Sequence, residues 1–168
     1  MNSSADGFRV DVQRRVRAWA PRAREIATWA ATALGASAAR GELGVRVVGA
    51  AESRRLNARY RGKDRPTNVL SFPAAPLPPR SFAPPAGRRR DERASRPLGD
   101  LVICAQVVRA EARAQQKSLK AHWAHLVVHG ALHLVGYDHE RDAAQAQRME
   151  RREIAVLRRL GFDNPYRM

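Results

Sequence analysis

Residues 98–116 read LGDLVICAQVVRAEARAQQ, and the pattern of apolar residues changes in the middle of this stretch. Up to Cys104 the residues include the short apolar run DLVIC, which is typical of a β-strand. From about Gln106 onward the apolar residues recur at helical spacing, and helical patterns continue to near Leu160. Strands therefore concentrate before Cys104 and helices after it, which predicts an α+β fold with helices packed on a small sheet.

The same hydrophobic patterns give the individual elements. Strands are expected at 8–12, 43–48, 67–72 and 100–104, and helices at about 21–34, 51–60, 106–116, the histidine region around 129, and 142–160. Pro21 is expected as an early residue of the first helix, while Gly35 and Gly161 are expected to end the first and the last helix. The prediction is thus a small mixed sheet of about four strands covered by about five helices. Trp19, Trp29 and Trp123 are expected in its core.

Composition narrows the class of protein. A chain of 168 residues fits one domain, 1–168, and its formal net charge of +15 attracts polyanions. Nucleic acid is the favoured partner, with an anionic membrane surface and simple solubility as alternatives. The sequence has no apolar run long enough to span a bilayer and no signal-peptide pattern, and its single cysteine, Cys104, has no internal partner. These features predict a cytoplasmic protein that does not act at a membrane.

A segment at about 74–97 differs from the rest of the chain. It holds six of the ten prolines and six arginines, and it lacks hydrophobic periodicity. It is therefore predicted to be a long mobile loop within the domain. Whether it is a tolerated insertion or a basic arm that contacts RNA remains open.

The histidines form the most specific motif. Residues 129–139 read HGALHLVGYDH, and His129 and His133 are four residues apart, so both lie on one helical face and can bind one ion from adjacent turns. Gly136 suits the end of that helix, and a chain reversal there would return His139 to the same ion. Three imidazole ligands with an open fourth position are typical of catalytic zinc. The predicted metal ligands are therefore His129, His133 and His139, with one Zn²⁺ per chain.

Two neighbouring features limit this interpretation. The spacing matches the metalloprotease string H-E-x-x-H-x-x-G-x-x-H, but Gly130 stands where the protease carries its catalytic glutamate. Glycine has no side chain to act as a base, so a metallopeptidase remains an alternative supported by histidine spacing alone. His122 and His125 are expected to be packing residues and are left out of the site.

HGALHLVGYDH resembles the signature of the YbeY-type endoribonucleases, a family of bacterial rRNA maturation factors. LNARYRGKDRPTNVLSFP (56–73), LGDLVIC (98–104) and the segment 115–118 are also similar to motifs of this family, in the same order. The resemblance covers nearly the whole chain except its first residues and the segment 74–97, which is longer than usual for the family. The family motif often has aspartate where this chain has Asn68, so no acid role is assigned there.

The resemblance implies a single-strand-specific metallo-endoribonuclease acting in 3′-end maturation of 16S rRNA and in ribosome quality control. It implies Zn²⁺ as the cofactor and, as partners, single-stranded RNA, rRNA, the small ribosomal subunit, ribosomal proteins and a ribosome-assembly GTPase. Arg61 matches the arginine of the family's LN-x-x-YR motif, and the resemblance implies a catalytic role for it on phosphate oxygens. Lys63 and Arg65 are expected to assist RNA binding through charge. Asp138 is expected either to orient a ligand histidine or to cap the turn.

RNA chemistry makes the missing glutamate at position 130 tolerable. The nucleophile can be the RNA's own 2′-hydroxyl or a water activated by the metal, and either leaves stabilisation of phosphate charge as the main requirement. A non-enzymatic alternative also remains, in which the chain is a zinc-containing, rRNA-binding ribosome-assembly chaperone without cleavage activity. Binding and cleavage would use the same basic surface, so the sequence leaves both possibilities open.

Overall fold

A computed structural model describes residues 2–5, 7–75 and 95–167 of the chain. Five strands in these ranges form one mixed sheet in the order β1-β2-β3-β5-β4. They are β1 (Asn2–Ala5), β2 (Phe8–Arg14), β3 (Gly41–Val48), β4 (Val69–Pro73) and β5 (Arg96–Cys104). β2, β3 and β5 are parallel, whereas β1 and β4 run antiparallel to their neighbours at the two edges. The predicted small mixed sheet is confirmed, with β1 as a strand that the sequence pattern did not indicate.

The five predicted helices are also present. They are α1 (Ala23–Leu34), α2 (Ala50–Arg61), α3 (Ala105–Ala114), α4 (Leu119–Leu134) and α5 (Ala143–Arg159), with a short 3₁₀ turn, η1 (Gly35–Ala38), after α1. The prediction that Pro21 lies inside the first helix is wrong. Arg22 still has extended backbone, and its N–H donates to the Glu25 carboxylate. The helix therefore begins after Arg22, at Ala23.

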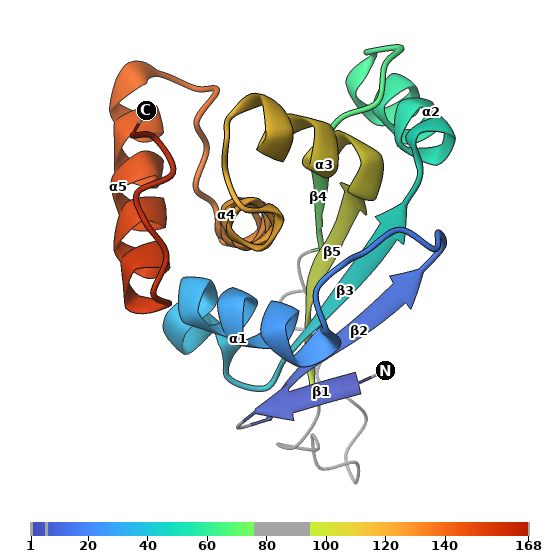
Figure 1. Ribbon diagram of the computed structural model, residues 1–168. Coiled ribbons are helices and arrows are strands. Elements are labelled where there is room, and N and C mark those ends of the chain that lie inside the picture. Colours follow the sequence, from blue (N-terminus) through green and yellow to red (C-terminus); the bar gives the residue numbers. More distant parts are fainter. Residues whose placement is uncertain (1, 6, 76–94, 168) are drawn as a thin grey trace, which may run out of the picture.

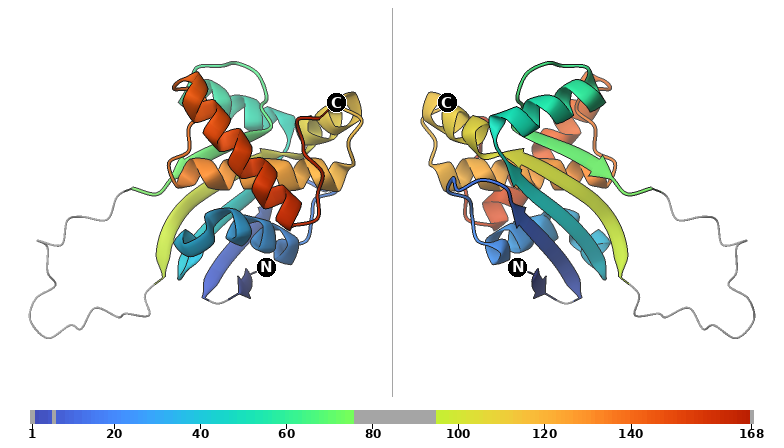
Figure 2. Two further views of the ribbon diagram at one scale, coloured as in Figure 1. Left: turned by 90° about the vertical axis from the view of Figure 1, so that its left-hand side faces the viewer. Right: turned by 90° about the vertical axis from the view of Figure 1, so that its right-hand side faces the viewer.

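The helices are arranged in layers on the sheet. α1 and α4 lie side by side on one face, and α5 packs against α4 (Figures 1 and 2). Successive side chains of β5 point to opposite faces of the sheet, so β5 contributes to the packing on both faces. Leu101 and Ile103 lie on the face that α1 and α4 cover. Val102 and Cys104 face the opposite way, where Leu56 of α2 packs on them. α4 is thus the central helix, with the sheet on one side and α5 on another.

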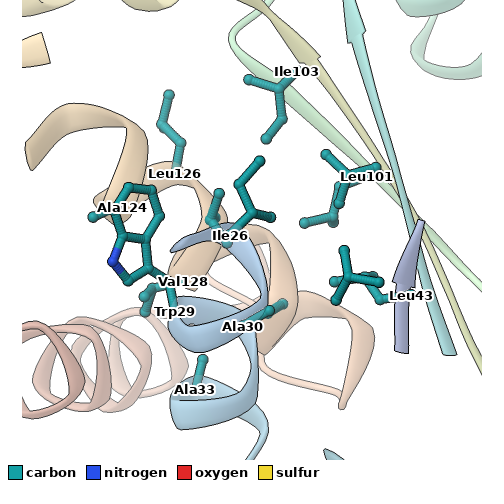
Figure 3. Packing of buried hydrophobic residues seen from close by; sticks show 14 of the residues in the cluster. Ile26, Trp29, Ala30, Ala33, Leu43, Leu101, Ile103, Ala124, Leu126 and Val128 are labelled. Atoms are coloured by element: carbon teal, nitrogen blue, oxygen red, sulfur yellow. The ribbon is translucent and has the colours of Figure 1, made fainter. Parts of the chain in front are cut away.

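The main core fills the space between the sheet and the helices α1 and α4 (Figure 3). Its labelled members are Ile26, Trp29, Ala30 and Ala33 of α1, Ala124, Leu126 and Val128 of α4, and Leu43, Leu101 and Ile103 of the sheet. Trp29 and Trp123 are buried, as predicted. Trp19 is 51% exposed, so that prediction is wrong. The residue lies between β2 and α1, outside the stripe of α1 that faces the core.

The predicted loop at 74–97 extends two residues too far at its C-terminal end. Arg96 and Pro97 already belong to β5 and pair with Gly41 and Glu42 of β3. The rest of that prediction concerns residues 76–94, which lie outside the described residues. None of the helices in the described ranges is long and apolar enough to cross a membrane.

Candidate metal centre in a histidine-lined cleft

A row of histidines runs along one side of α4. The Ser118 hydroxyl accepts the N–H of Ala121 at 3.1 Å and caps the helix, which then carries His122, His125, His129 and His133 at spacings of three and four residues. All five histidines of the chain line one open cleft of about 600 Å³. His122 is almost fully buried and His125 mostly so, as expected of packing residues, but both also form part of the cleft wall.

Three of these histidines form a compact triangle at the end of α4. The ring centroids of His129, His133 and His139 lie 4.8, 4.9 and 5.0 Å apart. Gly136 has φ +99° and its N–H donates to the carbonyl of His133, so the helix ends there and the chain turns back. The Asp138 carboxylate accepts the N–H of Glu140 at 2.8 Å and therefore caps this turn. The predicted return of His139 to the other two histidines is confirmed.

The triangle fits a single metal ion. One nitrogen from each ring lies within 4.8 Å of the others, and Nδ1 of His139 is 2.9 Å from Nε2 of His133. Imidazole nitrogens bound to one tetrahedral zinc lie about 3.3 Å apart, so small ring rotations suffice. Burial and the neighbouring His129 and His139 lower the pKa of His133 to about 4, so its imidazole is neutral at pH 7. Neutral imidazole is the form that binds a metal, and this group can therefore hold one.

A buried carboxylate lies behind the triangle and was missed by the sequence reasoning. Glu153 of α5 is 1% exposed and accepts hydrogen bonds from Nδ1 of His129 and the hydroxyl of Tyr166. Burial alone would raise the pKa of Glu153, but His125, 3.7 Å away, and the hydrogen bond from His129 outweigh burial and lower it to about 2. His125, His129 and Glu153 form a second group whose ligand atoms lie within 4.8 Å. The available signal was a glutamate on the apolar stripe of α5, four residues after Met149.

Arg61 lies at the rim of the histidine triangle. It is the last residue of α2, which ends at Gly62 with φ +69°. Its Nη2 donates to Oε1 of Glu140 at 2.5 Å, and the same oxygen is 4.0 Å from Nε2 of His139. Arg61 and the triangle thus face one cleft, although they come from elements far apart in the sequence.

The segment between α2 and β4 carries two more cations into the cleft wall, Lys63 and Arg65. Two buried polar side chains of α2 fix this segment in place. The Asn57 amide donates to the carbonyl of Arg65 at 2.8 Å, and the Ser53 hydroxyl bonds both the N–H and the carbonyl of Thr67 at 2.9 Å. The local sequence therefore folds so that its cations stand at a defined place beside the site.

The inner end of the cleft is held by a polar network. The Asn68 amide donates to both oxygens of Glu111 at 3.2 Å, and Nε2 of His122 lies 2.7 Å from Oε2. Burial would raise the pKa of Glu111, but the hydrogen bonds from His122 and Asn68 lower it. Asn68 thus acts as a hydrogen-bond donor, which agrees with assigning it no acid role. Lys117 adds a fourth cation to the lining and donates to the carbonyl of Pro165.

The position that distinguishes this site from a metalloprotease faces strands β4 and β5 of the sheet. Gly130 is buried, and a Cβ placed there would lie 2.9 Å from Cδ2 of Leu101 and 3.3 Å from the Ser71 hydroxyl. The Ser71 hydroxyl also donates to the carbonyl of Gly130 at 3.1 Å. A glutamate at this position would therefore have to displace the buried Leu101 side chain.

In this α+β fold, three histidines that could hold a metal ion and four cations line one open cleft, an arrangement suited to a polyanionic substrate. The chain belongs to the YbeY endoribonuclease family: the sequence profile described as "Endoribonuclease YbeY" matches residues 9–161. This confirms the resemblance seen in the sequence. Membership places the chain among endoribonucleases that take part in rRNA processing.

A solved structure supports the fold. The solution structure of TM1509 from Thermotoga maritima is similar with a TM-score of 0.52 and 21% sequence identity. The match covers 90% of this chain and 91% of that chain. At this identity the likeness concerns the arrangement of helices and strands, and it extends to almost the whole length of both proteins.

Proposed function

We propose that this chain is a zinc-dependent, single-strand-specific endoribonuclease that matures the 3′ end of 16S rRNA and takes part in ribosome quality control. The observation that carries the proposal is the gathering of three histidines and Arg61 in one cationic cleft of a family endoribonuclease. In this proposal residues 1–168 act as one cytoplasmic domain. Its partners are single-stranded rRNA and the small ribosomal subunit, with ribosomal proteins and a ribosome-assembly GTPase as further partners.

The metal ligands in this proposal are His129, His133 and His139. Three borderline imidazole nitrogens suit zinc and suit magnesium or calcium poorly. When bound, zinc would polarise a phosphate oxygen or lower the pKa of a water molecule. The exposure of the histidine triangle to the cleft supports a catalytic rather than a closed structural site. The His139 side chain is 41% exposed, and all three rings line the cleft.

Arg61 has the role of a phosphate ligand in this proposal. Its planar guanidinium can pair with two phosphate oxygens and stabilise the charge that grows on them during cleavage. In the structure that guanidinium is bound to the Glu140 carboxylate, which therefore occupies the place of an anion. An RNA phosphate would replace Glu140 as the partner of Arg61. Lys63, Arg65 and Lys117 line the same cleft and would attract the rest of the RNA backbone.

The two alternatives lack a comparable observation. A metallopeptidase needs a general base beside the metal, whereas Gly130, at the protease position, has no side chain and packs against Leu101 and Ser71. A chaperone with a structural zinc has no need for an open ligand position or for an arginine beside it. Here the three histidines line an open cleft that Arg61 also lines.

The test compares substrates and variants of the full chain. The proposal predicts cleavage of a fluorescent single-stranded RNA, little cleavage of the same sequence in a duplex, and no cleavage of peptides. The variants His129→Ala and His133→Ala should remain folded and lose RNA cleavage, while still binding RNA through the cations. RNA cleavage at the wild-type rate by both folded variants would refute the proposed site.

A further inference from the structure

Glu153 is an unusual residue for its position. It lies on the stripe of α5 that also carries Met149, Val156 and Leu157, all of them buried. Removing a carboxylate from water costs free energy unless hydrogen bonds compensate for the loss. The hydrogen-bond partners that compensate here are His129 of α4 and Tyr166, and the His125 ring lies 3.7 Å from the carboxylate. A carboxylate is thus maintained at a core position where an apolar side chain would otherwise be expected.

The direction of the hydrogen bond to His129 has a chemical consequence. An ionised carboxylate only accepts hydrogen bonds, so the hydrogen must be on Nδ1 of His129. The neutral ring then has its free electron pair on Nε2, the nitrogen left to bind an ion. Metal-binding histidines generally need such an outer partner to fix their tautomer and ring orientation.

Tyr166 holds the carboxylate from the other side. Its hydroxyl donates to Oε2 of Glu153, whereas His129 bonds Oε1, so the two oxygens have different fixed donors. Tyr166 lies in the segment after α5, beyond the residues 9–161 that match the family profile. The Lys117 ammonium donates to the carbonyl of the preceding Pro165 and ties this segment to the start of α4. The Tyr166 ring also packs edge-on against His125, with centroids 5.4 Å apart.

From these contacts we infer that Glu153 is a positioning residue for the metal site and that Tyr166 fixes it. Glu153 keeps His129 in the tautomer with hydrogen on Nδ1 and directs Nε2 toward the ion. The C-terminal segment therefore contributes to metal affinity without touching the metal. This inference rests on the proposed function, because it assumes that His129 binds the ion.

The experiment measures zinc binding and the His129 tautomer on the full chain. Zinc affinity is determined by competition with a chromophoric chelator, and the tautomer of the metal-free protein by long-range ¹⁵N–¹H NMR. The variants are Glu153→Gln and Tyr166→Phe. Their matched controls are Glu150→Gln, one turn earlier on α5, and Tyr60→Phe, an exposed tyrosine outside the cleft lining. Thermal unfolding of each metal-free variant measures the fold separately.

Glu153→Gln should weaken zinc binding by ~10- to 100-fold, the loss typical for an outer partner of a metal ligand. It should also give a mixture of His129 tautomers, because an amide can either donate or accept. Tyr166→Phe should lose affinity in the same direction by a smaller factor, and both controls should bind zinc as the wild type does. These results would support the inference, since a purely structural role would not change the tautomer of a folded protein.

The results that would contradict the proposed function differ from those that would contradict this inference. A wild-type chain that binds no zinc would overturn the proposed function. Normal zinc binding by the wild type and by folded Glu153→Gln would overturn this inference alone. If Glu153→Gln does not fold, Tyr166→Phe decides, and zinc affinity equal to that of Tyr60→Phe would overturn the inference. Loss of zinc in His125→Ala as large as in Glu153→Gln would mean that the ion binds His125, His129 and Glu153 directly, which also contradicts it.

Discussion

Replacing Arg61 with alanine separates catalysis from RNA binding. If the guanidinium stabilises charge that develops on the phosphate, the variant should cleave saturating RNA ~10²-fold more slowly, the loss typical of one preorganised donor. RNA affinity should fall far less, because Lys63, Arg65 and Lys117 line the same cleft and remain. Arg61→Lys should recover only part of the rate, because a point charge cannot make the two-pronged contact.

The structure indicates that this loss cannot come from unfolding. Arg61 and Glu140 are 40% and 55% exposed, so breaking their ion pair should change stability by only about 0–1 kcal/mol. A ~10²-fold slower rate corresponds to about 2.7 kcal/mol in the transition state, which is well above that value. Glu140→Gln is the matched variant: it removes the carboxylate that competes for Arg61 and should therefore tighten RNA binding without lowering the maximal rate.

The assay is single-turnover cleavage of a single-stranded, 3′-extended rRNA fragment over a range of protein concentrations. Zinc content and thermal unfolding are measured for each variant, so that losses of metal or fold are recognised. If Arg61→Ala cleaves RNA at the normal maximal rate but needs a higher protein concentration to reach it, Arg61 is a binding residue. The reasoning about transition-state charge would then be refuted.

Three further predictions follow from the same geometry. The logarithm of the RNA association constant should fall linearly with the logarithm of the salt concentration, and the four cations of the cleft lining give a slope of about −3 for single-stranded RNA. RNA binding that does not change with salt would contradict the assignment of the cleft as the RNA site. Gly130→Glu should destabilise the protein by about 3 kcal/mol or more in denaturant unfolding and create no peptidase activity, because its side chain would meet Leu101 in the core. The pKa of His133 is lowered from 6.5 to about 4, so the folded metal-free protein binds fewer protons than the unfolded chain between these values. Its stability should therefore fall as pH drops from about 6.5 to about 4, and denaturant unfolding of His133→Asn should show a flatter dependence in this window.

The histidine triangle could be predicted from sequence because its geometry is local. Helical spacing aligns His129 with His133, and Gly136 ends the helix and allows the chain to return His139 within six residues. The overall α+β arrangement was predictable for a similar reason, since the change of pattern after Cys104 marks the change from strand to helix.

The rest of the site depends on contacts that no short pattern contains. Glu153 reaches His129 across 24 residues, and Glu140 pairs with Arg61 across 79 residues. Each depends on how helices pack rather than on the periodicity of one helix. The error at Trp19 has a different origin: the residue precedes the first helix, where no helical stripe shows which side chains face the core.

In the proposed function, the histidine triangle holds the metal that RNA cleavage requires. The most direct measurement combines elemental analysis of the purified chain with cleavage of a single-stranded RNA before chelation, after chelation and after zinc is restored. We expect about one zinc per chain, loss of cleavage on chelation, and recovery when zinc returns to the wild type but not to a His129→Ala, His133→Ala double variant. Undiminished cleavage by the fully chelated protein, or an unchelated protein that carries only magnesium or calcium, would contradict it.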